Sequence, residues 1–192
     1  MTNIANILTM SRIAAIPLIA ALLFFDQPVL RWIAFALFAI ACITDFFDGY
    51  IARRMAQVSA LGRFLDPIAD KLVVAAILMV MTAHGQIRGW VVLPALIILC
   101  REILVSGLRE YLAELKVRLP VSILAKWKTT MQMVAMGFLI VGESAVPPSW
   151  PIQIVGEGLL WLAAALTLLT GYDYLRVGLK HMAEDDRADK KQ

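Results

Sequence analysis

The sequence predicts an all-α integral membrane protein: six transmembrane helices with a polar cavity at their cytoplasmic end, preceded by a short amphipathic N-terminal segment. Composition is the first indication, because 60% of the 192 residues are hydrophobic and only 17% are charged. Soluble domains are usually about half apolar and a quarter charged. The second indication is that the apolar residues form long stretches, and the third is that Lys and Arg gather in alternate loops.

Six apolar stretches are each close to the length of about 20 residues that a helix needs to cross a bilayer. They cover residues 7–25, 31–52, 65–84, 89–112, 121–142 and 151–175. In hydrocarbon only helices and closed barrels satisfy their backbone hydrogen bonds, and runs this long and apolar form helices. We therefore expect one six-helix membrane domain over residues 1–176 and a charged cytoplasmic tail over residues 177–192.

Polar or turn-forming segments separate these stretches, at residues 26–28, 53–62, 84–86, 116–120 and 142–151. An even number of crossings puts both termini on one side of the membrane, together with the loops near residues 53–63 and 113–120. That side carries most of the loop cations, namely Arg53, Arg54, Arg63, Lys116, Arg118, Lys180, Arg187, Lys190 and Lys191. The opposite loops carry only Arg31 and Arg88.

The positive-inside rule therefore predicts a multi-pass protein of the bacterial inner membrane, or an equivalent one, with both termini in the cytoplasm. Five or seven crossings would divide this asymmetry between the two sides. We expect the lipid bilayer as a partner and no nucleic acid.

The first stretch begins with a polar stripe, because Asn3, Asn6, Thr9 and Arg12 recur at three-residue intervals. One interpretation is an amphipathic segment in the membrane interface, stabilised by polar headgroups. The other is that the stripe lines a polar cavity inside the protein. The sequence favours neither, and both can hold.

Four aspartates, Asp45, Asp48, Asp66 and Asp70, lie within or at the ends of apolar stretches. Insertion scales put the cost of one such carboxylate at about 2.5–3.5 kcal/mol, so four unpaired ones would cost on the order of 10 kcal/mol. At about 100° per residue, Asp45 and Asp48 share a helix face, and so do Asp66 and Asp70. The polar segment between the two pairs lets the helices turn back antiparallel, so we expect all four carboxylates in one cavity.

An all-carboxylate site with few cations nearby indicates hard divalent metals, and two Mg²⁺ or Mn²⁺ ions would balance the four charges. Parts of the pattern have simpler explanations. Asp66 before a proline is a good helix start, and Gly49 and Gly62 could serve helix packing. Intramembrane carboxylates also form cation or proton pathways in transporters, but those predict carboxylates spread through the membrane and an inverted repeat.

The run Asp45-Phe46-Phe47-Asp48-Gly49-Tyr50-Ile51-Ala52-Arg53, followed after eight residues by Gly62, Asp66 and Asp70, resembles the signature of the CDP-alcohol phosphatidyltransferase family. Every fixed position of that signature is present at its spacing. The resemblance implies a six-helix membrane fold and a homodimer. It also implies transfer of a phospho-alcohol unit from a CDP-linked donor to a hydroxyl acceptor, with release of CMP.

The resemblance assigns roles to these positions. Asp45, Asp48 and Asp66 would hold two divalent metals, and Asp70 would contribute to the metal site and act as the catalytic base. The residues implied to bind the nucleotide are Asp48, Gly49, Ala52, Arg53 and Gly62. Gly49, Ala52 and Gly62 are small enough for close approach of the nucleotide, and Arg53 can supply charge to its phosphates.

A basic cluster, comprising Arg101, Arg109, Lys126 and Lys128, lies in the fourth and fifth stretches. A short loop brings Arg109 and Lys126 together, and Arg101 lies about two turns deeper on a similar face. Cations beside an anionic site suggest an acceptor that itself carries phosphate. Alternatively, Arg109 and Lys126 snorkel to lipid headgroups, and Arg101 forms an internal structural pair with Glu102.

Segments 101–110 and 126–132, together with residues 3–12 and Pro17, resemble the family branch that uses CDP-diacylglycerol and glycerol 3-phosphate. This likeness runs from about residue 3 to residue 176 and implies phosphatidylglycerophosphate and CMP as products, in phospholipid biosynthesis. Neighbouring branches make cardiolipin, phosphatidylinositol phosphate or phosphatidylserine and share the aspartates. They therefore stay open as alternatives.

Overall fold

The computed structural model describes residues 4–55, 60–114, 117 and 123–189. Within these ranges, the side chains at 4–6, 8, 45–55, 60–64, 66–67, 70, 114, 180–181 and 183–189 lie outside the description. The described part contains six α-helices and no strand, which confirms the all-α class. They are α1 (Ile4–Leu23), α2 (Pro28–Met55), α3 (Ala60–Ala83), α4 (Val92–Glu114), α5 (Ile123–Val141) and α6 (Ile152–Asp189). Two short 3₁₀ turns, η1 (Gly89–Val91) and η2 (Glu143–Ala145), precede α4 and α6.

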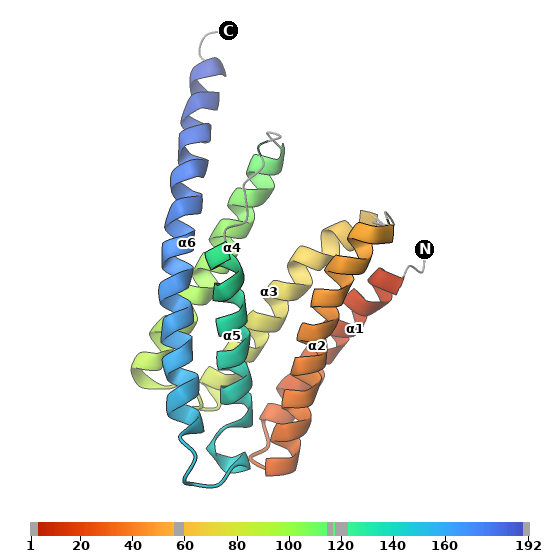
Figure 1. Ribbon diagram of the computed structural model, residues 1–192, viewed down its shortest axis with the longest axis vertical. Coiled ribbons are helices and arrows are strands. Elements are labelled where there is room, and N and C mark those ends of the chain that lie inside the picture. Colours follow the sequence, from red (N-terminus) through yellow and green to blue (C-terminus); the bar gives the residue numbers. More distant parts are fainter. Residues whose placement is uncertain (1–3, 56–59, 115–116, 118–122, 190–192) are drawn as a thin grey trace.

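Each apolar stretch corresponds to one helix, and successive helices run in opposite directions (Figure 1). The starts of α1, α3 and α5 and the ends of α2, α4 and α6 therefore lie toward the same end of the molecule (Figure 1). This is the arrangement expected from an even number of crossings. The side of the membrane on which that end lies stays a prediction.

Helix α6 continues well beyond its apolar stretch, through most of the segment that we expected to form a charged tail. No glycine or proline occurs after Gly178. The helix therefore meets no residue with a strong tendency to end it before the chain terminus.

Two helical segments of the described part are long and apolar enough to cross a membrane, Gly89–Ala113 and Ile152–Leu179. Three shorter apolar helical segments accompany them, Thr9–Leu23, Pro28–Thr44 and Lys71–Ala83. Large apolar side chains also face outward on several helices, as at Met79, Ile154 and Leu169. These features indicate a membrane protein, while six crossings stay a prediction.

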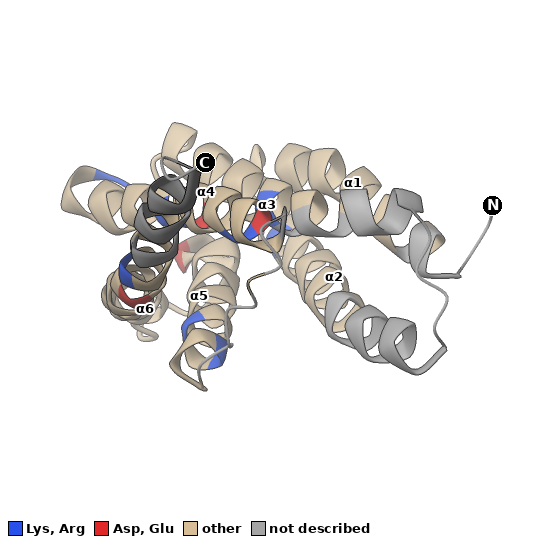
Figure 2. Ribbon diagram, turned by 90° about the horizontal axis from the view of Figure 1, so that it is seen from above, with Lys and Arg blue, Asp and Glu red and all other residues tan. Residues whose placement is uncertain are grey.

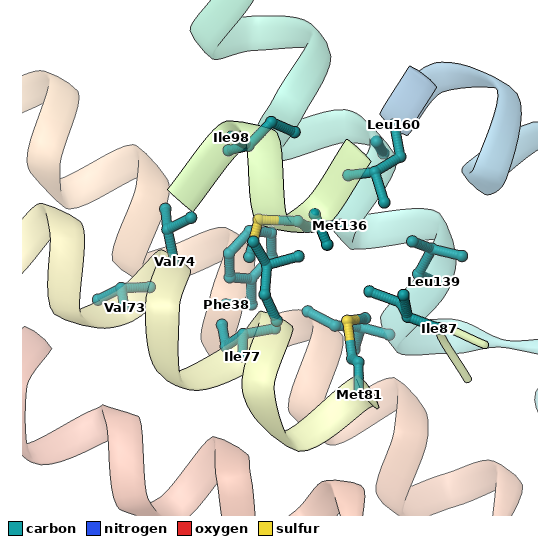
Figure 3. Close-up of a cluster of buried hydrophobic side chains, with 14 of the residues drawn as sticks. Phe38, Val73, Val74, Ile77, Met81, Ile87, Ile98, Met136, Leu139 and Leu160 are labelled. Atoms are coloured by element: carbon teal, nitrogen blue, oxygen red, sulfur yellow. The ribbon is translucent and has the colours of Figure 1, made fainter. Parts of the chain in front are cut away.

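Helix α1 packs against both α2 and α3, α6 packs against α4 and α5, and contacts between α2 and α5 join the two groups. Figure 3 shows the core between them, where side chains from α2 to α6 meet, including Phe38, Ile77, Ile98, Met136 and Leu160. The core thus fixes how the two groups of helices stand relative to each other.

A smaller cluster joins α4 to α6 nearer the end where both helices finish. Val105, Leu108 and Leu112 of α4 pack there against Tyr174 of α6. Next to it Gly178 allows a close approach, because a Cβ at that position would lie 2.6 Å from Leu108 Cδ1. The α4–α6 contact is therefore tight in the part of the bundle that carries the basic residues.

The N-terminal polar stripe faces the protein interior where its side chains are described. Thr9 is 1% exposed and Arg12 is 4% exposed. Since headgroup contact requires an exposed polar face, this burial favours the interpretation in which the stripe lines the inside of the protein. The side chains of Asn3 and Asn6 lie outside the described residues.

Candidate functional site

A cavity of about 280 Å³, bordered mainly by charged residues, lies between α3 and α4. Its lining consists of Lys71, Arg101, Glu102, Val105, Ser106, Arg109, Glu110 and Ala113. Charged positions of α3 and α4 lie close together in the middle of the view in Figure 2. Two of the four residues of the basic cluster, Arg101 and Arg109, thus face one cavity.

Glu102 ties two cations of the cluster together. Lys128 Nζ donates to Glu102 Oε1, and Arg101 Nη1 lies 3.5 Å from the same oxygen. The Lys128 side chain is only 4% exposed. A buried ammonium needs a partner of opposite charge, so Glu102 allows Lys128 to lie inside the bundle. The internal pair of Arg101 with Glu102, one of the two interpretations of the basic cluster, is therefore present. Lys128 shares the same carboxylate.

Helix α6 contributes a second set of contacts to the same arginines. Arg101 Nη2 donates to Thr170 Oγ1 at 3.0 Å. The Tyr174 ring centroid lies 5.8 Å from Arg101 Cζ and 5.2 Å from Arg109 Cζ. Both distances are within the range of a cation–π interaction. Sequence reasoning gave Thr170 and Tyr174 no role.

Lys71 links α3 to α4 at the cavity. Its Nζ donates to Ser106 Oγ, and the Ser106 hydroxyl in turn donates to Glu110 Oε1 at 3.5 Å. Sequence reasoning gave Lys71 no role in the site. The sequence signal for a role of Lys71 was its position inside an apolar stretch, where an unpaired cation is costly.

Lys126 differs from the rest of the basic cluster. It is exposed on the first turn of α5, and it is not among the residues that line the described cavity. The fold thus brings Arg101, Arg109 and Lys128 together around one polar region and leaves Lys126 at the surface.

The predicted metal ligands occupy neighbouring ends of two consecutive helices. Asp45 and Asp48 belong to the last turns of α2, and Asp66 and Asp70 belong to the first turns of α3. Their side chains, and those of the predicted nucleotide residues Gly49, Ala52, Arg53 and Gly62, lie outside the described residues. No group of three or more potential metal ligands occurs within the described part.

The backbone nevertheless relates the aspartates to the cavity. Asp70 immediately precedes Lys71 on α3, and Lys71 lines the cavity. The end of α2 and the beginning of α3 also lie at the same end of the molecule (Figure 1). Asp70 therefore directly precedes a residue of the cavity, whose lining combines the cations Lys71, Arg101 and Arg109 with the carboxylates Glu102 and Glu110.

The family model of CDP-alcohol phosphatidyltransferases matches residues 2–169. The chain belongs to the CDP-alcohol phosphatidyltransferase family. The match includes the aspartate signature and almost the whole helical bundle, so it confirms the family that the signature indicated. Members of this family are generally metal-dependent.

Curated members of the family from several bacteria resemble this chain over nearly their whole length. One from Rickettsia bellii is 46% identical, over 93% of this chain and 97% of its own. One from Cereibacter sphaeroides is 39% identical, over 95% of this chain and 98% of its own. One from Shigella flexneri is 42% identical, over 90% of this chain and 93% of its own. Each of the three is named CDP-diacylglycerol–glycerol-3-phosphate 3-phosphatidyltransferase.

Proposed function

We propose that this chain is a divalent-metal-dependent CDP-diacylglycerol–glycerol-3-phosphate 3-phosphatidyltransferase. It transfers the phosphatidyl group of CDP-diacylglycerol to glycerol 3-phosphate, giving phosphatidylglycerophosphate and CMP. The observation that carries the proposal is the cavity with Lys71, Arg101 and Arg109 beside the aspartate segment. The names of the relatives agree with it.

The aspartates Asp45, Asp48, Asp66 and Asp70 would hold the metal ions. Four carboxylates from α2 and α3 are a donor set that suits Mg²⁺ or Mn²⁺ and not a soft metal. Two such ions, when bound, would neutralise charge on the donor diphosphate and on the departing CMP.

The nucleotide would lie along the same helix ends, against Asp48, Gly49, Ala52, Arg53 and Gly62. The small residues among them allow the nucleotide to approach the helix backbone closely. Arg53 adds positive charge beside the phosphates.

The phosphate of glycerol 3-phosphate would bind in the cavity between α3 and α4. Arg101 and Arg109 are lining residues, and Lys128 reaches the same region through Glu102. A guanidinium donates two parallel hydrogen bonds to a phosphate, which fixes the orientation of the acceptor as well as its affinity. Exposed Lys126 would attract the anion at longer range.

Binding the acceptor phosphate there directs the glycerol hydroxyl toward the aspartates. Asp70 would accept the proton of that hydroxyl. The hydroxyl oxygen then forms a bond to the β-phosphorus, counted from the cytidine, and the bond from this phosphorus to the oxygen of CMP breaks. We place this reaction at the cytoplasmic face of the membrane, in a homodimer.

The decisive experiment measures release of labelled CMP from CDP-diacylglycerol by the purified protein with Mg²⁺ and one acceptor at a time. We expect release that depends on glycerol 3-phosphate. Release that required inositol phosphate, phosphatidylglycerol or serine instead would contradict the proposed acceptor and leave the family chemistry intact.

Arg109→Ala and Lys126→Ala should have unequal effects on the acceptor. A charge-assisted contact to phosphate contributes about 1.5–3 kcal/mol, so losing Arg109 should weaken the apparent affinity for glycerol 3-phosphate roughly 10- to 150-fold. Lys126→Ala should have a smaller effect, since Lys126 is exposed and does not line the described cavity. Steady-state kinetics with each substrate varied separately would measure both. An equal loss of donor affinity in Arg109→Ala would place Arg109 at the donor site.

A further inference from the structure

Two guanidinium groups that begin far apart on α4 converge on one aromatic ring of α6. Arg101 and Arg109 are eight residues apart, which is about 12 Å along a helix axis. Both Cζ atoms nevertheless lie within 5.8 Å of the centroid of Tyr174. The Tyr174 side chain is buried at 7% exposure, so the ring is held by its surroundings. Its electron-rich face stabilises two positive charges that would otherwise repel each other.

One turn earlier, Thr170 fixes the orientation of Arg101. The Thr170 hydroxyl donates to the backbone oxygen of Leu166 at 2.9 Å, so its lone pairs remain available. Arg101 Nη2 donates to Thr170 Oγ1 at 3.0 Å. Thr170 is 1% exposed. A hydroxyl anchored in this way to its own helix gives Arg101 one preferred direction.

Between these two contacts, Gly171 provides the space that the Arg101 side chain occupies. A Cβ built at position 171 would lie 3.1 Å from Arg101 Cγ and 3.4 Å from its Nε. Most real Cβ contacts are longer, so the Arg101 side chain would have to shift by a few tenths of an ångström. Because Arg101 lines the cavity between α3 and α4, its side chain has room to move away from α6.

Neither Thr170 nor Tyr174 is among the residues that line the described cavity. Their contacts are to the arginines. We propose that Thr170, Gly171 and Tyr174 of α6 are positioning residues, and that they set the affinity for the acceptor phosphate by holding Arg101 and Arg109 as a pair. This inference rests on the proposed function, in which that pair binds the phosphate of glycerol 3-phosphate.

Gly171→Ala tests the inference with the smallest change. Alanine favours a helix over glycine, so the variant should fold. The displaced Arg101 should nevertheless raise the KM for glycerol 3-phosphate several-fold, on the scale of a partly lost charge-assisted contact. The KM for CDP-diacylglycerol should not change. Gly158→Ala is the matched control on the same helix, because a Cβ there would meet nothing within 4 Å.

Tyr174→Leu and Tyr174→Phe separate the aromatic face from the rest of the side chain. Leucine removes the face and should raise the KM for glycerol 3-phosphate roughly tenfold, whereas phenylalanine should keep it close to the wild-type value. If phenylalanine raised that KM as much as leucine, the ring face would not be the relevant contact, and the proposal would be wrong.

Thermal stabilisation of the detergent-purified protein by inorganic phosphate supplies a readout that does not need the reaction. We expect phosphate to raise the Tm of the wild type and of Gly158→Ala, and to raise that of Gly171→Ala less at the same concentration. Equal responses in all three proteins, or none in the wild type, would overturn the inference. The proposed function fails separately, if phosphate binds but glycerol 3-phosphate releases no CMP.

Discussion

Asp45→Asn, Asp48→Asn and Asp66→Asn should each abolish transfer while leaving the protein in the membrane. Asparagine keeps the shape of the side chain but removes the negative charge that a hard divalent cation requires. A bound metal contributes several kcal/mol to stabilising the transition state. Since each 1.36 kcal/mol corresponds to a factor of ten, we expect turnover to fall on the order of a thousandfold or more.

The measurement is labelled CMP release over a Mg²⁺ titration, with membrane insertion checked by fractionation. Glu143→Gln is the matched control, because Glu143 is an exposed carboxylate in η2, far along the chain from the aspartates. We expect this control to keep its activity. A variant of Asp45, Asp48 or Asp66 with near-normal turnover at saturating Mg²⁺ would not have lost a metal ligand, and its assignment would be wrong.

Asp70→Asn should separate catalysis from donor binding. If Asp70 accepts the proton of the acceptor hydroxyl, turnover should fall by roughly two to four orders of magnitude, the usual contribution of a general base. Affinity for the donor in the presence of metal should change much less, because Asp45, Asp48 and Asp66 remain. Calorimetric titration with a non-hydrolysable analogue of CDP-diacylglycerol, beside the rate measurement, compares the two quantities directly.

The opposite result is equally informative about Asp70. Donor affinity that fell in proportion to the rate would make Asp70 mainly a metal ligand. The proton would then need another acceptor, and the phosphate of the acceptor substrate, bound at Arg101 and Arg109, is a candidate.

The sequence by itself determined the helical class, the order of the helices and the family. Helices in a membrane must satisfy their own backbone hydrogen bonds within a segment, so long apolar runs predict them without knowledge of any contact. The aspartate signature has the same local character, because Asp45 and Asp48, or Asp66 and Asp70, are less than two turns apart on one helix. Helix periodicity alone places each pair on a common face.

Only the tertiary structure decided how the basic cluster is organised. Lys128 meets Glu102 across 26 residues of sequence, and Arg101 meets Thr170 across 69. No local period relates such positions, because these contacts depend on how α4, α5 and α6 pack. The packing of α3 against α4 brings Lys71 to the cavity of Arg101 and Arg109, and the packing of α6 against α4 places Tyr174 beside both arginines. Lys126 stays exposed. The sequence identified the cations, whereas contacts between different helices, namely Lys71–Ser106, Lys128–Glu102 and Arg101–Thr170, determined which of them lie together.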